Sequence, residues 1–203
     1  MDRRYVGIDL HRRRSVIYAM DAEGERLFCE RIDNDALRLL EVVSVAGDGA
    51  EVVIEATYGW YWAVDLLRDA GFNVHLAHPS GNDWGKRRVK NDERDARDLA
   101  DLLRLGRLAE AWIAPPAVRE ARELVRYRAR LVQLRSGLKA QVHSVMAKEG
   151  VLPETSDMFG PKGRQLLDAM ELADAYQVRV ESLRDLIEGY EGECQMLCVR
   201  GRF

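Results

Sequence analysis

The segment Tyr5-Val-Gly-Ile-Asp-Leu-His11 decides the fold that this chain is expected to adopt. Its apolar and β-branched residues predict a β-strand over Tyr5–Leu10. Because side chains alternate between the two faces of a strand, Gly7, Asp9 and His11 are expected on one face. Gly7 has no side chain, which leaves room beside Asp9 of the kind that a metal ion or a phosphate needs. The segment therefore predicts a sheet strand that carries a functional acid.

The elements that follow alternate between strand and helix signals. Two more strands are expected at Ser15–Asp21 and Arg26–Ile32, then a helix at Ala36–Val45, a strand at Val52–Ala56, a helix at Gly59–Ala70 and a strand at Val74–Ala77. Three consecutive strands followed by helix, strand, helix and strand predict a mixed sheet with helices packed on it. This is the element order of the ribonuclease-H-like fold, so we expect an α/β domain over residues 1–112.

Three further acids accompany Asp9. Glu55 ends a nearly all-apolar strand, where an unpaired charge would be costly. The segment Lys90-Asn-Asp-Glu-Arg-Asp-Ala96 opens a helical pattern, and at ~100° per residue Asp92 and Asp95 lie ~60° apart on the face expected to meet the sheet. Asp92 could instead be no more than the N-cap of that helix. Four acids from two strands and a helix start suit a divalent-metal site that acts on a phosphate backbone.

Basic residues gather in two places. The net charge of −3 conceals a segment, 117–148, with eight Lys and Arg against two Glu, and a segment, 154–193, with ten acids against four bases. The residues expected to contact phosphate are Lys86, Arg87, Arg88 and Lys90 beside the acids, and Arg119, Arg122, Arg126, Arg130, Arg135 and Lys139 on a long helix. An ordinary solvated helix face is the alternative. His11 either assists proton transfer near the metal or is a hydrogen-bonded bystander.

Heptad repeats dominate the second half of the chain. Apolar residues recur every seven positions at Leu124, Leu131, Leu138 and Val145, with Tyr127 and Leu134 at companion positions. After a segment rich in Gly and Pro the repeat returns at Leu166, Ala173, Val180 and Ile187, with Tyr176, Leu183, Tyr190 and Leu197 as companions. The pattern predicts a helical coiled-coil hairpin over residues 113–203. Heptads do not separate packing within one chain from packing between chains; we expect a homodimer or higher oligomer.

Several classes of protein are disfavoured. The odd number of cysteines (Cys29, Cys194, Cys198) gives no disulfide framework and no zinc pattern, and fits reduced thiols in a cytoplasm. No signal peptide and no apolar run near 20 residues is seen, so no membrane partner is expected. A sugar-kinase-like or actin-like ATPase also opens on a strand-borne Gly-x-Asp, but its later phosphate-loop glycines are not evident here.

Three motifs carry a resemblance to a known family. Gly7–His11, Ile54–Thr57 and Lys90–Ala100 resemble the DEDD transposases of insertion-sequence family 110, and the likeness runs from Tyr5 to about Gly150. It implies an N-terminal domain similar to Holliday-junction resolvases, with a catalytic tetrad at Asp9, Glu55, Asp92 and Asp95 that binds Mg²⁺ or Mn²⁺. It further implies DNA recombination guided by a structured RNA, and a helical extension that dimerises and holds nucleic acid.

The chain also departs from the family pattern. Members continue into a C-terminal transposase domain with a catalytic serine, and this chain stops at Phe203, so no serine is assigned and that domain is expected to be absent. The sequence thus predicts a truncated transposase or recombinase. The alternatives are a non-catalytic regulator that binds nucleic acid or dimerises, and a stand-alone resolvase-like nuclease.

Overall fold

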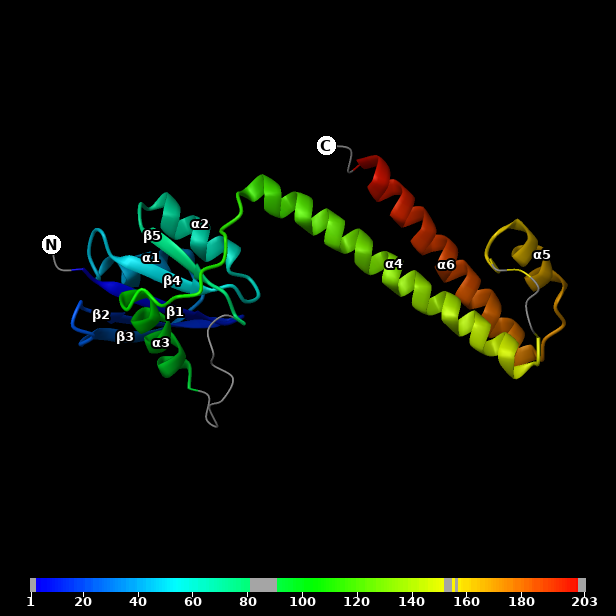
Figure 1. Ribbon diagram of the computed structural model, residues 1–203, viewed down its shortest axis with the longest axis horizontal. Coiled ribbons are helices and arrows are strands. Elements are labelled where there is room, and N and C mark those ends of the chain that lie inside the picture. Colours follow the sequence, from blue (N-terminus) through cyan, green and yellow to red (C-terminus); the bar gives the residue numbers. More distant parts are fainter. Residues whose placement is uncertain (1–2, 81–90, 152–154, 156, 201–203) are drawn as a thin grey trace. The chain divides into compact units, whose positions relative to one another are not determined.

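The computed structural model describes residues 3–80, 91–151, 155 and 157–200. The chain divides into two compact units, Met1–Ile113 and Ala114–Phe203 (Figure 1). The first unit is built on a sheet and the second is helical, so each is described separately.

A five-stranded mixed sheet forms the first unit. In spatial order its strands are β3 (Arg26–Asp33), β2 (Arg14–Met20), β1 (Tyr5–Leu10), β4 (Glu51–Glu55) and β5 (Asn73–Ala77). β1, β2 and β3 pair antiparallel as a meander, whereas β4 pairs parallel with both β1 and β5. The predicted α/β architecture with a mixed sheet is confirmed, and β1 lies at its centre.

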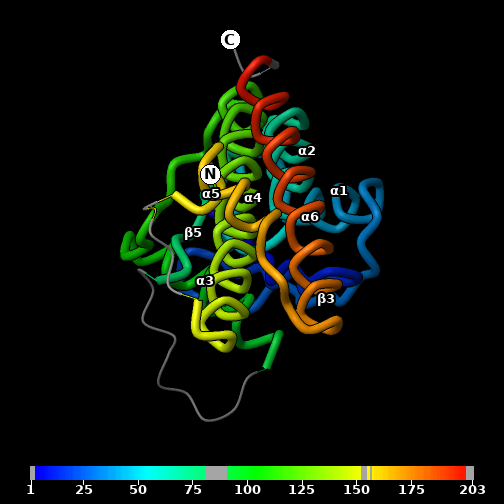
Figure 2. Tube along the Cα trace, turned by 90° about the vertical axis from the view of Figure 1, so that its right-hand side faces the viewer, coloured from blue at the N-terminus to red at the C-terminus, as the bar shows by residue number. Residues whose placement is uncertain are grey.

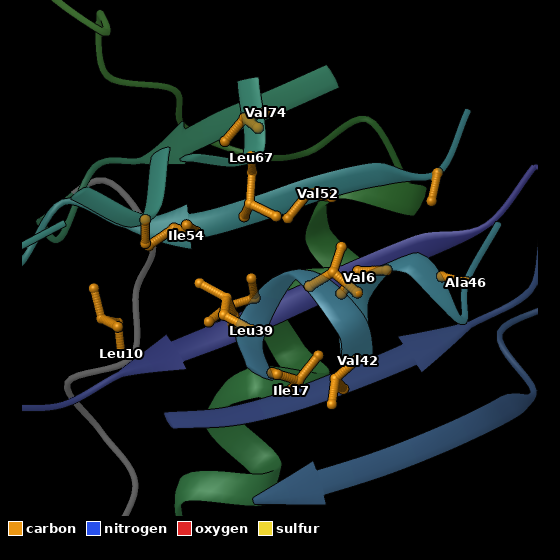
Figure 3. Close-up of a cluster of buried hydrophobic side chains, with 14 of the residues drawn as sticks. Val6, Leu10, Ile17, Leu39, Val42, Ala46, Val52, Ile54, Leu67 and Val74 are labelled. Carbon is orange, nitrogen blue, oxygen red and sulfur yellow. The ribbon is translucent and has the colours of Figure 1, made fainter. Parts of the chain in front are cut away.

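Two helices cover one face of the sheet. They are α1 (Ala36–Ser44), which Asp35 caps by accepting a hydrogen bond from the Arg38 amide, and α2 (Tyr61–Asp69). Figure 3 shows the core that they enclose, in which Leu39 and Val42 of α1 meet Val6 of β1 and Val52 of β4. These side chains are removed from water almost completely, so their burial supplies much of the stability of this unit.

The opposite face is covered by α3 (Asp92–Arg104). Ala96 and Ala100 of this helix pack on Tyr5 and on β2, and Leu99 packs on β4. The helix approaches β1 so closely that a Cβ atom on Gly7 would lie 2.0 Å from the carbonyl oxygen of Ala96. The interpretation that Gly7 leaves room for a metal or phosphate was therefore wrong, because the space is filled by the α3 backbone.

The β5 edge of the sheet is occupied by the chain as it leaves this unit. The amide of His78 donates to the carbonyl of Ala109, and the amide of Ala111 donates to the carbonyl of Leu76. His75 lies in the same region with Nε2 2.7 Å from Glu51 and Nδ1 3.0 Å from Glu110. These contacts attach residues 109–111 to the sheet.

The second unit is a hairpin of two long helices with a third, short helix between them in the chain. α4 (Pro116–Lys148) and α6 (Asp174–Arg200) lie side by side, and α5 (Pro161–Ala169) lies near their connection (Figures 1 and 2). The core joins Val142, Val145 and Met146 of α4 to residues of α5 and α6, namely Leu167, Val180, Leu183 and Ile187. The predicted long helices are present.

Two details of the heptad prediction were wrong. The second repeat does not run through one helix, because the chain leaves helical geometry at Met170, and Leu166 therefore lies in α5. In α4, Tyr127 and Leu134 are 49% and 38% exposed, whereas Val142 is buried. The contact side of α4 thus follows positions 131, 138, 142 and 145. In the part of the chain that the structure describes, no helix is long and apolar enough to cross a membrane.

Candidate metal centre

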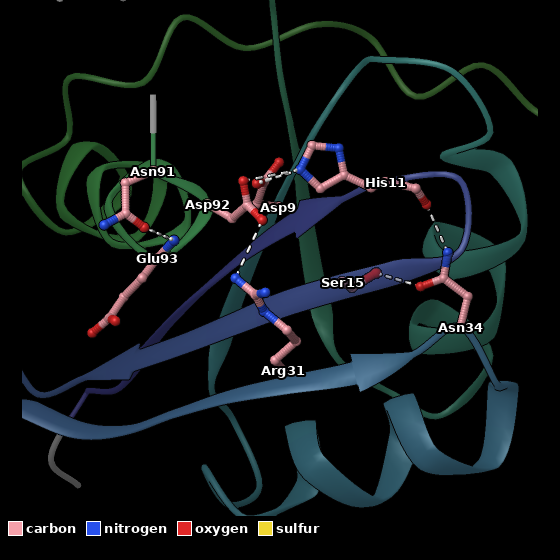
Figure 4. A network of polar contacts seen from close by, with 8 residues as sticks. All are labelled: Asp9, His11, Ser15, Arg31, Asn34, Asn91, Asp92 and Glu93. Carbon is pink, nitrogen blue, oxygen red and sulfur yellow. Dashed lines mark hydrogen bonds and ion pairs between the residues drawn. The ribbon is translucent and has the colours of Figure 1, made fainter. Parts of the chain in front are cut away.

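The candidate site lies where β1 ends. Asp9, the next-to-last residue of β1, is 92% buried, with an exposed fraction of 8%. It faces α3 because it lies two residues after Gly7, on the same face of the strand. The first turn of α3, with Asp92, and the turn after β1, with His11, close the site around it (Figure 4).

Three possible metal ligands converge at this point. Nε2 of His11 lies 3.0 Å from Oδ2 of Asp9 and 3.7 Å from Oδ1 of Asp92. One ligand atom from each of the three residues lies within 4.8 Å of the others. The side chain of Asp9 is 12% exposed, but those of Asp92 and His11 are 31% and 47% exposed, so the group opens to solvent on one side.

The surroundings of Asp9 disfavour its negative charge. Burial raises the pKa of the Asp9 carboxyl, and the nearby charges of Asp95 and Asp92 raise it further, while the charge of His11 acts in the opposite direction. Its Oδ2 atom is buried and accepts no well-aligned hydrogen bond from any described residue, although Nε2 of His11 lies 3.0 Å away. A buried carboxylate oxygen in this condition is stabilised best by a cation.

Asp92 is held in place by its neighbours. Its Oδ2 accepts a contact from Nη2 of Arg31 on β3 at 3.3 Å, which leaves Oδ1 directed toward His11. Asn91, and not Asp92, is the N-cap of α3, because its side chain accepts a hydrogen bond from the Glu93 amide at 3.1 Å. The alternative in which Asp92 serves only as the cap is therefore wrong.

The other two predicted acids lie nearby but outside this group. Asp95 is close enough to affect the pKa of Asp9 and lies half-buried one turn along α3. Glu55 ends β4, one residue beyond Ile54, the partner of Ile8 in the parallel register. Glu55 and Asp9 are thus neighbours on adjacent strands and share the sheet face that α3 covers. The group of ligand atoms within 4.8 Å of one another, however, consists of Asp9, His11 and Asp92, and does not include Glu55 or Asp95.

The sequence interpretation gave too little weight to the turn that carries His11. The amide of Asn34 donates to the carbonyl of Arg13, and its side-chain nitrogen donates to the carbonyl of His11 at 2.7 Å. Ser15, which is 1% exposed, donates to the Asn34 side chain at 2.6 Å. The run His11-Arg-Arg-Arg14, which begins two residues after Asp9, was the available signal, and Arg12 through Arg14 are exposed.

The residues fit a divalent cation. Two carboxylates and one imidazole nitrogen are ordinary protein ligands for such ions. The buried Oδ2 of Asp9 accepts no well-aligned hydrogen bond among the described residues and has only the His11 imidazole close by, and the partial exposure of Asp92 and His11 provides a route of entry. The acidic group could therefore hold a metal ion.

The predicted phosphate-binding residues have different surroundings. Lys86, Arg87, Arg88 and Lys90 lie outside the described residues. On α4, Arg122, Arg126 and Arg130 are exposed, whereas Arg119 is buried with 6% exposure. Arg135 pairs with Glu191 of α6 at 3.2 Å, and the ammonium of Lys139 lies 4.7 Å from the centre of the Phe159 ring. The exposed basic face of α4 is thus smaller than the sequence indicates.

Comparison with known proteins identifies relatives. The family model of the DEDD transposases of insertion-sequence family 110, described as a transposase, matches residues 6–149. "Putative transposase y4qE" of Sinorhizobium fredii is 28% identical over 157 residues, which are 72% of this chain and 39% of that protein. "Insertion element IS116 uncharacterized 44.8 kDa protein" of Streptomyces clavuligerus is 28% identical over 174 residues, 78% and 41% respectively. The chain therefore spans about two-fifths of the length of these curated relatives, and the resemblance read from the sequence is confirmed.

Proposed function

The chain belongs to the DEDD transposase family of insertion-sequence family 110, and from this we propose that it is the metal-binding, DNA-processing part of a transposase. In this proposal Asp9, Glu55, Asp92 and Asp95 form the catalytic tetrad and hold Mg²⁺ or Mn²⁺. The substrate is DNA, and a structured guide RNA from the same mobile element directs the reaction.

The observation that supports the proposal best is the state of Asp9. A carboxylate that is buried, lies near two further acids and has one oxygen without a well-aligned hydrogen bond costs stability in the folded protein, and the half-exposed His11 imidazole 3.0 Å away offsets this cost only in part. Such an arrangement is maintained in proteins where a function needs it, and perturbed carboxyls cluster at functional sites. A bound cation would offset the remaining cost, because it would contact the buried Oδ2 of Asp9 directly and reduce the repulsion between Asp9 and Asp92.

Each residue has a definite task in this scheme. A bound divalent ion supplies Lewis-acid chemistry at a phosphodiester, activating the attacking oxygen and stabilising the leaving one. Asp9 provides the buried anchoring oxygen, and Arg31 fixes the orientation of Asp92. The exposed Arg12 and Arg13 lie in the turn beside Asp9, where they would position the phosphate backbone of the DNA.

Metal binding is tested by thermal unfolding with and without the ion. Mg²⁺ or Mn²⁺ at 100 times its dissociation constant should stabilise the protein by about 2.7 kcal/mol. Asp9→Asn and Asp92→Asn should each remove this gain. Asp101→Asn is the matched control, because Asp101 lies on the same helix and pairs with Arg104 at 2.7 Å, away from the site. If the Asp92→Asn protein still gained stability from the ion, the assignment of the site would be wrong.

Cleavage separates an enzyme from a regulator. The proposal expects Mg²⁺- or Mn²⁺-dependent nicking of branched DNA that requires the guide RNA and is lost in Asp9→Asn. A protein that binds branched DNA and the ion but never cuts it would be a non-catalytic regulator. Cutting of branched DNA without any guide RNA would favour a stand-alone resolvase-like nuclease.

The helical unit is proposed to bind nucleic acid and a second copy of the chain. The exposed cations Arg122, Arg126 and Arg130 support the first part of this proposal. Tyr127 and Leu134 support the second, because these large apolar residues remain exposed at heptad positions when α4 packs on α6. Two copies would also place two metal centres in one complex, as the joining of two DNA duplexes requires.

A further inference from the structure

His11 stands out because it is neither an acid nor a member of the tetrad, yet it contacts Asp9 directly. Its Nε2 atom is 3.0 Å from Oδ2 of Asp9 and 3.7 Å from Oδ1 of Asp92. Ligands around an ion with bonds of ~2.1 Å lie ~3.0 Å apart when adjacent and ~4.2 Å apart when opposite. The two distances from Nε2 of His11 fall within this range, and one ligand atom from each of the three residues lies within 4.8 Å of the others, so a small rearrangement would let all three contact one ion.

The position of His11 is fixed by hydrogen bonds that involve its backbone. The amide of His11 donates to the carbonyl of Arg14 at 3.1 Å, and its carbonyl accepts from the side chain of Asn34 at 2.7 Å. Asn34 is oriented in turn by Ser15, which is almost fully buried (Figure 4). A residue whose only role was to neutralise nearby acids would not need this support, whereas a ligand gains affinity from being held in position.

The chemistry of the imidazole adds a preference among metals. Mg²⁺ favours sites made of oxygen ligands and water, whereas imidazole nitrogen suits first-row transition metals. A site with only carboxylates would therefore serve Mg²⁺, and one nitrogen in the set favours an ion such as Mn²⁺, which accepts both donor types.

We infer that His11 is a nitrogen ligand of the ion held by Asp9 and Asp92, and that it shifts the preference of the site from Mg²⁺ toward Mn²⁺. The inference rests on the proposed function in one respect, since it requires that Asp9 and Asp92 bind a divalent ion. His11 is then a ligand of the active centre and not a bystander.

Mn²⁺ provides a direct probe of this bond. The full chain loaded with Mn²⁺ should show nitrogen coupling in electron spin-echo envelope modulation, and the coupling should vanish in His11→Ala. The ratio of the Mg²⁺ to the Mn²⁺ dissociation constant, measured by titration calorimetry, should fall by about tenfold or more in His11→Gln, which offers an oxygen in place of the nitrogen. Because the side chain of His11 is 47% exposed, both variants should fold.

A matched control comes from the second histidine that contacts two acids. His75 lies between Glu51 and Glu110, and His75→Gln should leave both the nitrogen coupling and the ratio unchanged. Asn34→Ala should weaken Mn²⁺ binding without removing any ligand, because it releases the His11 backbone. A loss of coupling in His75→Gln would overturn the inference.

The possible failures are distinguishable. If Asp9→Asn abolishes Mn²⁺ binding but the wild-type protein shows no nitrogen coupling, the metal site stands and His11 is only a charge partner. If Mn²⁺ binds equally well to Asp9→Asn, the proposed function loses its metal centre, and the inference falls with it.

Discussion

Replacement of Gly7 by alanine measures how tightly α3 must lie on β1. The added Cβ would lie 2.0 Å from the carbonyl oxygen of Ala96 and 2.8 Å from the amide nitrogen of Ala100. Close carbon–oxygen contacts in proteins begin at about 3.3 Å, so α3 would have to move outward by about 1.3 Å. Both atoms belong to the helix backbone, and no side-chain rotation can relieve the clash.

The expected cost lies at the upper end of the range for overpacked cores, about 3 kcal/mol. For a unit of this size that corresponds to a fall of roughly 10 °C in the midpoint of thermal unfolding. The displacement should also weaken metal binding, because α3 carries Asp92 away from Asp9.

Tryptophan fluorescence during urea unfolding is the suitable assay. All four tryptophans of the chain fall within the residue range of the sheet unit, 1–113, and none falls within that of the helical unit, so their signal reports on the sheet unit. Gly137→Ala in α4 is the control: an added Cβ there has nothing within 4 Å, and alanine should stabilise the helix by about 1 kcal/mol without moving the tryptophan transition. If Gly7→Ala unfolded at the same urea concentration as the wild-type protein, the described packing of α3 on β1 would be refuted.

Three further predictions concern the charge of Asp9, the basic face of α4 and assembly. Burial raises the pKa of Asp9 above its ordinary 3.8, so between the two pKa values the folded protein holds a proton that the unfolded chain releases. The stability of the metal-free protein should therefore fall as pH rises from about 3.8 through the raised pKa. Urea titrations at several pH values should show this fall for the wild-type protein and not for Asp9→Asn. Arg126→Gln should reduce the magnitude of the slope of log DNA affinity against log salt concentration by roughly 1. Arg135→Gln is the control, because it loses the contact with Glu191 and should chiefly lower stability. Equal slopes for the wild-type protein and Arg126→Gln would contradict a phosphate contact at Arg126. Tyr127→Asp combined with Leu134→Asp should give monomers in light scattering with unchanged helix content, and a wild-type protein that is already monomeric at high concentration would rule out the proposed dimer.

The sheet was predictable because its periodicity is strong. Tyr5–Leu10 was expected as a strand with these limits, and the ends of the other strands differ from expectation by no more than one residue. The face of α3 was also predictable, since Leu99 and its helical neighbours could bury only one side. Gly7 was misinterpreted because a missing side chain indicates a close approach but not what approaches.

Longer-range arrangements were harder to predict. The predicted heptad repeat continued across Met170, because a seven-residue spacing of apolar residues gives no signal of where one helix ends and the next begins. Tyr127 and Leu134 occupy heptad positions but are exposed, whereas Val142, which the predicted repeat did not include, is buried in the core of the hairpin. His11 could be placed on the correct face, yet its approach to Asp9 and Asp92 depends on the turn that Asn34 holds, and no local pattern encodes that contact.

The apolar core of the helical hairpin is concentrated at one end. Its buried cluster runs from Val142 to Ile187, near the connection between the helices, whereas toward Arg200 of α6 large apolar residues such as Met196 and Val199 remain exposed. Amide hydrogens near Val145 should therefore exchange with solvent far more slowly than those of the last turns of α6. Local opening of the hairpin would begin at that weaker end, and each opening would uncover the length of α4 that contains Leu131. A partner that captured this transient state would bind the hairpin without unfolding its core.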